Sequence, residues 1–224
     1  MLKHFLNRQP GRPWWRIAWW HMLHLLCYVW FFACYRFRGW GVHNVPRTGP
    51  ILLVSNHQSF LDPIIIGLAA HHRQFSAMAR STLFLNPIFS WLIRSLNALP
   101  VAQGEGDLRA MRRCIDILKQ GQALLVFPEG ARCKDGHTAD FQPGTMLLIK
   151  RAKPQVVPVA LEGAFEVWPH FRSVPKAFGH IKVIYGEPIP AERLIAMTSQ
   201  DATRYLRDTV EAMRLELSKT VSRD

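Results

Sequence analysis

Residues 51–63 read ILLVSNHQSFLDP and mark the passage from one kind of secondary structure to another. The four aliphatic residues that open this stretch are typical of a strand that is buried on both faces of a sheet. Asp62 and Pro63 near its end give a capping residue followed by proline, the pattern that begins a helix. The polar residues between these two signals therefore predict a turn that leaves a strand and enters a helix.

The rest of the chain repeats this alternation of short apolar runs with longer mixed segments. We expect further strands at residues 75–79, 98–101, 123–127, 156–161 and 181–185. We expect helices at residues 63–70, 86–96, 107–119 and 144–151, and a last helix from residue 199 onward. Strands that alternate with helices predict an α/β domain in which helices flank a largely parallel or mixed sheet.

A hydrophobic segment occupies residues 17–35 and contains no Asp, Glu, Lys or Arg. Its length is close to the ~20 residues that span a bilayer as a helix. Its tryptophans, tyrosines and two histidines are also typical of a helix that lies in the membrane interface. We expect residues 1–40 to anchor the protein to a membrane, with residues 41–224 forming the α/β domain.

Two other interpretations of this segment compete with membrane association. A helix buried in a soluble core is the main alternative, although such a helix usually has a polar face. A signal peptide is disfavoured because no small-residue cleavage site follows the apolar stretch. Basic residues flank both ends of the segment. They therefore leave open its orientation and the choice between spanning the bilayer and lying in one leaflet.

The net charge of +12 implies an anionic partner, which can be nucleic acid, a membrane surface or a phosphorylated substrate. The basic residues are dispersed and no nucleic-acid-binding signature is present, so we expect no nucleic-acid partner. The four cysteines are scattered and form no CxxC pair. Neither a zinc site nor a disulfide framework is therefore expected, and reduced thiols in a cytosolic setting are the simpler interpretation.

His57 and Asp62 are the first candidate pair of catalytic groups. They lie five positions apart and do not share a helix face, but they can meet across a turn. A carboxylate against one imidazole nitrogen fixes the tautomer and leaves the other nitrogen free to take a proton near neutral pH. The alternative is that Asp62 only caps its helix and that His57 is a solvated turn residue. The spacing alone favours this alternative, because the chain has ten histidines.

A second polar stretch, FPEGARCKDG at residues 127–136, follows another expected strand. Gly130 permits a ligand to approach the backbone closely, and Arg132 can bind a phosphate through two hydrogen bonds. Ligands of such sheets gather beyond the carboxyl ends of the strands, so we expect this stretch and His57 to share one edge. The alternative is an ordinary turn with an exposed Glu129–Arg132 ion pair, worth ~0–1 kcal/mol.

Taken together, NHxxxxD and FPEGAR resemble the paired motifs of the glycerolipid acyltransferase family, typified by lysophosphatidic acid acyltransferases. The resemblance covers residues from about 50 to 190. The first motif matches Asn56, His57 and Asp62, the third matches Phe127, Pro128, Glu129, Gly130 and Arg132, and the fourth matches residues 157–161 around Pro158. The hydrophobic N-terminal segment is similar to the membrane-anchoring helices of this family.

The resemblance implies transfer of a fatty acyl group from a thioester of coenzyme A or acyl carrier protein to the hydroxyl of a lysophospholipid. The acceptor implied is 1-acylglycerol-3-phosphate, which gives phosphatidic acid. His57 would be the general base and Asp62 would orient it. The substrate-binding residues implied are Asn56, Phe127, Pro128, Glu129, Gly130, Arg132 and Pro158. The resemblance implies neither a metal nor a redox cofactor, and it places the protein at the membrane, with the cytoplasmic face of the cell membrane as the expected location.

The second motif departs from the family pattern. In the family, the second motif is a short apolar stretch followed by an arginine that holds the acceptor phosphate. At the position of that arginine this chain has Gln103, which carries no charge. Arg80 or Arg109 is then a candidate substitute. Two alternative functions stay open: acyl transfer to a different lysolipid or amphipathic acceptor, and a membrane lipid-binding protein without catalysis. The intact pair of His57 and Asp62 argues against the second, and the sequence leaves acyl chain length, donor and oligomeric state open.

Overall fold

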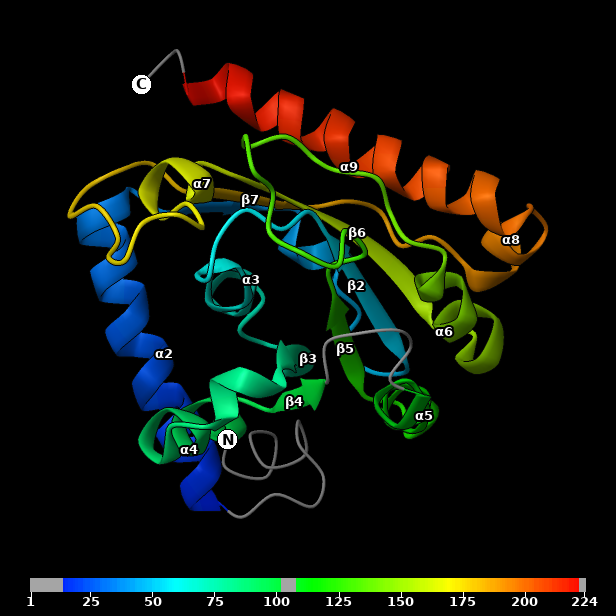
Figure 1. The fold of residues 1–224 in the computed structure, drawn as a ribbon, viewed down its shortest axis with the longest axis horizontal. Helices are drawn as coiled ribbons and strands as arrows, with labels where there is room; N and C mark the ends of the chain where they lie inside the picture. The colour runs from blue at the N-terminus through cyan, green and yellow to red at the C-terminus, as the bar shows by residue number, and fades with distance from the viewer. Residues whose placement is uncertain (1–13, 102–107, 222–224) are drawn as a thin grey trace.

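The computed structural model describes residues 14–101 and 108–221, and in this part of the chain the strands form a seven-stranded sheet (Figure 1). The order of the strands across the sheet is β1-β7-β6-β2-β5-β3-β4. Their bounds are β1 (Arg38–Trp40), β2 (Ile51–Ser55), β3 (Phe75–Arg80), β4 (Ala98–Val101), β5 (Ala123–Val126), β6 (Gln155–Glu162) and β7 (Lys182–Tyr185).

The strands from β6 to β4 are parallel to one another, while β7 runs antiparallel to β6 and parallel to β1. The prediction of a largely parallel or mixed sheet is therefore confirmed. The neighbours β2, β5 and β6 end close together in register, with Val54 opposite both Val126 and Pro158. The residues that follow these three strands consequently meet at one edge of the sheet.

Helices cover both faces of the sheet (Figure 1). On one face are α2 (Trp14–Tyr35), α3 (Asp62–Ala69) and α7 (Ala164–Val167); on the other are α5 (Leu108–Lys119), α6 (Gly144–Ala152), α8 (Ala191–Ile195) and α9 (Ser199–Val221). The remaining elements are α4 (Pro87–Ser95) and the 3₁₀ helices η1 (Val42–Asn44) and η2 (Ser81–Phe84).

Strand β2 is buried along its whole length because both of its faces meet helices. Its side chains alternate between two hydrophobic cores: Ile51 and Leu53 pack on the side of α2 and α3, whereas Leu52 and Val54 pack on the side of α5, α6 and α9. This placement explains the continuous aliphatic run in the sequence, since a strand covered on only one face would alternate with polar residues.

The helix that follows β2 starts differently from expectation. We expected Asp62 to cap it, but Asp62 is its first residue, Leu61 takes the cap position, and no side-chain cap bond is made. Its carboxylate instead accepts hydrogen bonds from the turn that precedes the helix. The same cap-then-proline expectation is confirmed at α4, where the Asn86 side chain accepts a hydrogen bond from the Phe89 backbone N–H.

The N-terminal hydrophobic segment is helical and has two unlike faces. Phe31 and Tyr35 of α2 are buried in the core beside α3, whereas Leu25, Leu26 and Phe32 are mostly exposed. In the described part of the chain, no helix pairs the length with the apolar character needed to cross a membrane. The domain boundary expected at residue 40 falls at the end of β1, which already belongs to the sheet.

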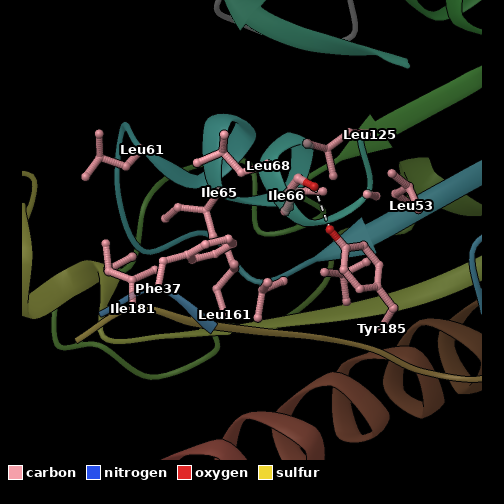
Figure 2. Packing of buried hydrophobic residues seen from close by; sticks show 14 of the residues in the cluster. Phe37, Leu53, Leu61, Ile65, Ile66, Leu68, Leu125, Leu161, Ile181 and Tyr185 are labelled. Carbon is pink, nitrogen blue, oxygen red and sulfur yellow. Dashed lines mark hydrogen bonds between the residues drawn. The ribbon is translucent and has the colours of Figure 1, made fainter. Parts of the chain in front are cut away.

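Tyr185 ties β7 to α3 inside the core. Figure 2 shows its ring among the packed side chains of Leu53 and Leu125, with its hydroxyl directed at α3. The hydroxyl donates to the Ile66 carbonyl oxygen at 2.5 Å, and burial raises the pKa of this phenol. The hydrogen bond satisfies a hydroxyl that would otherwise be buried without a partner.

Replacing Tyr185 by phenylalanine removes this hydrogen bond while keeping the ring. We expect the free energy of unfolding to fall by about 1–2 kcal/mol, because the Ile66 carbonyl loses a buried donor. Urea unfolding followed by circular dichroism measures the change. Tyr28→Phe is the matched control, since its ring is 42% exposed. Equal stabilities of the two variants would contradict the assigned role of the hydroxyl.

Candidate active site

The turn between β2 and α3 brings His57 and Asp62 together. His57 Nδ1 lies 2.7 Å from Asp62 Oδ2. The aspartate side chain is fully buried, whereas the histidine side chain keeps 20% of its surface exposed. The imidazole therefore has a carboxylate behind it and an accessible side in front.

The protonation pattern of this pair follows from the other partners of Asp62. The same Oδ2 atom also accepts the backbone N–H groups of Gln58 at 2.6 Å and Ser59 at 2.8 Å. An oxygen that accepts two N–H bonds is an acceptor toward the imidazole too, so Nδ1 donates. Nε2 of His57 is then left with its lone pair and can accept a proton.

Two opposing effects act on the Asp62 carboxyl. Burial raises its pKa above the ordinary value, while the hydrogen bonds from His57, Ser59 and Gln58 offset part of that rise. Its second oxygen, Oδ1, is buried and has no hydrogen-bond partner among the described residues. One oxygen therefore accepts all three hydrogen bonds, and the positions of the donors fix the shape of the turn.

The imidazole is also held from its face and through its backbone. The ring stacks on Phe127, with centroids 4.0 Å apart and planes inclined by 15°. The His57 carbonyl accepts the Cys133 N–H at 2.7 Å, and the His57 N–H donates to Glu129 Oε1 at 2.8 Å. The loop that follows β5 thus fixes His57 on three sides.

Glu129 is a buried carboxyl that joins two backbone segments. Besides the His57 N–H, it accepts the Ala139 N–H through Oε2 at 3.3 Å. Burial raises its pKa to about 7, and the nearby carboxyls of Asp62 and Glu211 add to the rise against the lowering by its hydrogen bonds. The structure thus uses Glu129 to hold the turn rather than in the exposed ion pair with Arg132 that was the alternative.

The Pro-Glu-Gly turn leads to Arg132, which packs on Phe60 of the turn between β2 and α3. Gly130 has φ +74°, and a Cβ there would lie 2.5 Å from the Gln142 side chain, so glycine is required. The Pro128 carbonyl accepts the Gln142 N–H at 2.9 Å and fixes the other side of the turn. The guanidinium of Arg132 lies 3.5 Å from the centre of the Phe60 ring.

Arg132 has a donor group without a partner. Its Nη1 atom is buried and has no hydrogen-bond partner among the residues that the structure describes. Burial lowers its pKa, and the charge of Arg80 adds to the lowering. Two neighbouring guanidinium groups suit a phosphate or a similar anion, and an arginine stays charged at any physiological pH.

The remaining predicted site residues lie elsewhere. The Asn56 amide bonds the backbone of Leu161 at 3.0 and 2.8 Å and thereby joins β2 to β6. Pro158 is buried within β6 opposite Val54, and the structure does not bring it to the imidazole. Gln103 lies outside the described residues, and Arg109 is an exposed residue of α5.

Sequence reasoning missed Gln58, which connects the turn to three other segments. Its side chain donates to the Gly136 carbonyl at 3.0 Å and accepts the Ala164 N–H at 3.2 Å. Its amide also lies 3.5 Å from Glu162 Oε2. The available signal was its position inside the motif, directly after a buried strand, where a polar side chain must find partners.

Arg214 on α9 is the second missed residue, and it ties the last helix to the site. It lies 2.9 Å from Glu162, 2.8 Å from Glu211 and 3.3 Å from His137 Nδ1. Its side chain is 6% exposed. A charged residue between core-facing Met213 and Leu217 was the available signal, because such a residue is rarely buried without partners.

A cavity of about 320 Å³ is lined by residues between Glu129 and Ala139, including Arg132 and Lys134. Among the described residues, no cluster of three or more His, Cys, Asp and Glu side chains is arranged to hold a metal ion. The site as built combines a carboxylate-bound imidazole with cationic groups. Such a site can deprotonate a hydroxyl on a molecule whose anionic part is held by arginine.

Comparisons with known proteins find relatives of this chain. The family model described as acyltransferase matches residues 36–162. A chloroplastic 1-acyl-sn-glycerol-3-phosphate acyltransferase of Arabidopsis thaliana is 31% identical over 152 residues, which is 66% of this chain and 42% of that protein. A lyso-ornithine lipid O-acyltransferase of Pseudomonas aeruginosa is 26% identical over 195 residues, covering 80% of this chain and 72% of that protein.

The crystal structure of the 1-acyl-sn-glycerophosphate acyltransferase PlsC of Thermotoga maritima superposes with a TM-score of 0.73 at 26% identity. The superposition covers 87% of this chain and 76% of that chain. By contrast, the chain spans less than half the length of three plant and algal relatives, at 42%, 44% and 46%.

The raised pKa of Glu129 predicts a pH dependence of stability. The folded protein keeps this proton up to about pH 7, whereas the unfolded chain releases it near the ordinary value of 4.5. The folded state thus binds more protons between these values, and its free energy of unfolding falls as pH rises through the window. Glu129→Gln mimics the protonated form. Across this pH window, the free energy of unfolding of the variant should therefore fall by about 3 kcal/mol less than that of the native protein. Urea unfolding from pH 4.5 to 7 tests this, and parallel curves for both proteins would contradict it.

Removing the Arg214 charge should destabilise the fold. Arg214→Met keeps most of the volume but leaves Glu162 and Glu211, 13% and 16% exposed, without their cation. We expect the free energy of unfolding to drop by about 3 kcal/mol, as when one partner of a buried ion pair is removed. Arg204→Met, on the exposed side of the same helix, is the control and should change little. A similar loss in both variants would refute the assignment.

Proposed function

This chain belongs to the acyltransferase family, and from that premise we propose that it transfers a fatty acyl group from an acyl thioester to the hydroxyl of a lysophospholipid. The acceptor that we propose is 1-acylglycerol-3-phosphate, which would give phosphatidic acid. This is the acceptor of the Arabidopsis and Thermotoga relatives by their names. The observation that carries the proposal is the contact of 2.7 Å between His57 and the buried Asp62.

The reaction that we propose needs one proton acceptor at His57. Nε2 takes the hydroxyl proton of the acceptor as its oxygen attacks the thioester carbonyl carbon. The tetrahedral intermediate then collapses, the carbon–sulfur bond breaks, and the imidazolium returns the proton to the departing thiolate. Asp62 orients the ring and stabilises its positive charge during this step. The donor is a thioester of coenzyme A or acyl carrier protein, and neither a metal nor a redox cofactor takes part.

Arg132 is the group that we propose to bind the acceptor phosphate. Its buried and unpartnered Nη1 supports this role, as does its position 3.5 Å above Phe60 at the open side of the site. Arg80 adds charge nearby. Glu129, Gly130 and Pro128 act through the backbone, because they shape the turn that presents Arg132. Phe127 fixes the imidazole plane by stacking.

A second candidate acceptor is a lysolipid with another headgroup. Two observations favour it: Gln103 replaces the arginine that the family motif usually has, and the Pseudomonas relative is named for a lyso-ornithine lipid. A non-catalytic lipid-binding protein would need neither the buried Asp62 nor its contact with His57. A non-catalytic lipid-binding function would therefore follow only from a negative activity test.

We also propose that residues 1–40 hold the protein at the cytoplasmic face of a membrane, with residues 41–224 as the catalytic domain. The exposed apolar side chains of α2 support an arrangement in which this helix lies in the interface of one leaflet. The net charge of +12 supports attraction to anionic headgroups, worth about 1 kcal/mol per basic residue near the surface.

The test is acyl transfer from labelled acyl-coenzyme A or acyl carrier protein to lysophosphatidic acid in detergent micelles. His57→Ala should lower turnover by ~10²–10⁴-fold, the usual contribution of a positioned general base. Asp62→Asn should also lower turnover, because an amide cannot accept all three donors with full charge. His43→Ala replaces an exposed histidine of η1 and should leave the rate unchanged.

The outcomes separate the candidates. Transfer to lysophosphatidic acid that is lost in a folded His57→Ala variant supports the proposal. Transfer to other lysolipids but not to lysophosphatidic acid supports the second acceptor. If the folded, lipid-bound protein transfers to no member of a lysolipid panel, the enzymatic proposal is wrong.

A further inference from the structure

The loop of residues 168–180, which follows α7, has an unusual surface. It reads WPHFRSVPKAFGH and contains no Asp or Glu, while Arg172 and Lys176 add positive charge. Three of its apolar side chains are mostly exposed: Phe171 at 68%, Val174 at 64% and Phe178 at 73%. Large apolar side chains grouped on one short exposed segment mark an interaction surface.

The loop has a defined conformation. Trp168 Nε1 donates to the Arg172 carbonyl at 2.9 Å, and the Lys176 N–H donates to the Val167 carbonyl at 2.9 Å. A Cβ at Gly179 would lie 2.5 Å from the Val167 side chain, so the chain packs closely there. The exposed side chains are therefore presented by an ordered loop rather than by a freely moving one.

Hydrogen bonds hold this loop against the carboxyl end of α2. Tyr35 Oη donates to the Lys176 carbonyl at 3.0 Å, and the Gly179 N–H donates to the Cys34 carbonyl at 3.1 Å. Arg36, directly after the helix, lies 3.5 Å from His180 through Nη1 and Nε2. Figure 1 shows the loop, in yellow, beside this end of the blue helix.

The apolar surface of α2 adjoins the loop. Large side chains in the second half of this helix are exposed: Leu25, Leu26, Val29, Trp30 and Phe32. The loop adds its three exposed apolar side chains and two cations without any acid. Aromatic side chains mixed with basic ones fit the interface of a bilayer that contains anionic lipids, where the rings enter the headgroup region and the cations meet phosphates.

The loop also reaches the active site. The Ser59 hydroxyl donates to the Trp168 carbonyl at 2.9 Å, and the rings of Phe60 and Trp168 lie 5.4 Å apart. Phe60 is the ring that Arg132 covers. The residue that begins the loop therefore contacts the turn that holds His57.

We propose that residues 168–180 are a second membrane-contact element, which inserts Phe171, Val174 and Phe178 into an anionic bilayer beside α2. This inference rests on the membrane association proposed above and adds a contact that is distant from α2 in the sequence. Two contacts fix the tilt of the protein on the surface, whereas a single helix leaves it free to rotate. The loop thereby sets how Phe60 and Arg132 face the lipid.

Vesicle co-sedimentation of the full chain tests the contact. The vesicles are phosphatidylcholine with or without phosphatidylglycerol. The double variant Phe171→Ser/Phe178→Ser should bind both about tenfold more weakly, since two exposed rings no longer insert. Arg172→Gln/Lys176→Gln should weaken binding about tenfold only when phosphatidylglycerol is present. Leu215→Ser, at a 45% exposed position on α9, is the control and should bind like the native chain.

A second readout separates this inference from the proposed function. Transfer to an acceptor embedded in vesicles should fall in the loop variants, while transfer to a short-chain, water-soluble acceptor should stay unchanged. A native chain that acylates neither acceptor would reject the proposed function, but the binding data would still decide the inference. Unchanged vesicle binding by the folded loop variants would overturn the inference. A loss of self-association in place of vesicle binding would also overturn it, by assigning the loop to contacts between copies.

Discussion

A carboxylate with no exposed surface, that of Asp62, is the constraint on which the site depends. An ionised carboxyl in such a place is costly unless donors surround it, and a single oxygen here takes three. Two of those donors are backbone groups of the turn and the third is the imidazole of His57. Any change in the turn would therefore remove hydrogen-bond donors from the carboxylate. The same oxygen atom of Asp62 thus sets both the shape of the backbone and the direction of the His57 ring.

The parallel part of the sheet supplies everything else that this pair needs. Because β2, β5 and β6 end at one edge, Glu129 can hold the backbone of His57 and Phe127 can support its ring. The antiparallel strand β7 contributes no group to the pair. Its role is structural, since it joins β1 to the sheet and carries Tyr185 into contact with α3.

Much of this arrangement could be predicted from local sequence, and the rest depends on distant contacts. Apolar runs such as residues 51–54 identified most strands, because burial on both faces leaves a continuous pattern. The three-residue strand β1 has exposed side chains and no such pattern. Asp62 was expected to cap its helix, which is the usual local use of aspartate, but the imidazole and two amides compete better. The roles of Gln58 and Arg214 were not predicted, because their partners lie far away in the sequence.

The ties between α9 and the site have a consequence for the order in which the protein is assembled. The ribosome synthesises the residues of β2, the turn with His57 and the loop from Glu129 to Ala139 before it reaches Arg214. Until that residue emerges, Glu162 lacks its cation and the loop lacks its anchor at His137. A nascent chain therefore contains His57 and Asp62 before it contains the residue that contacts Glu162 and His137, and these contacts form only when the last helix docks.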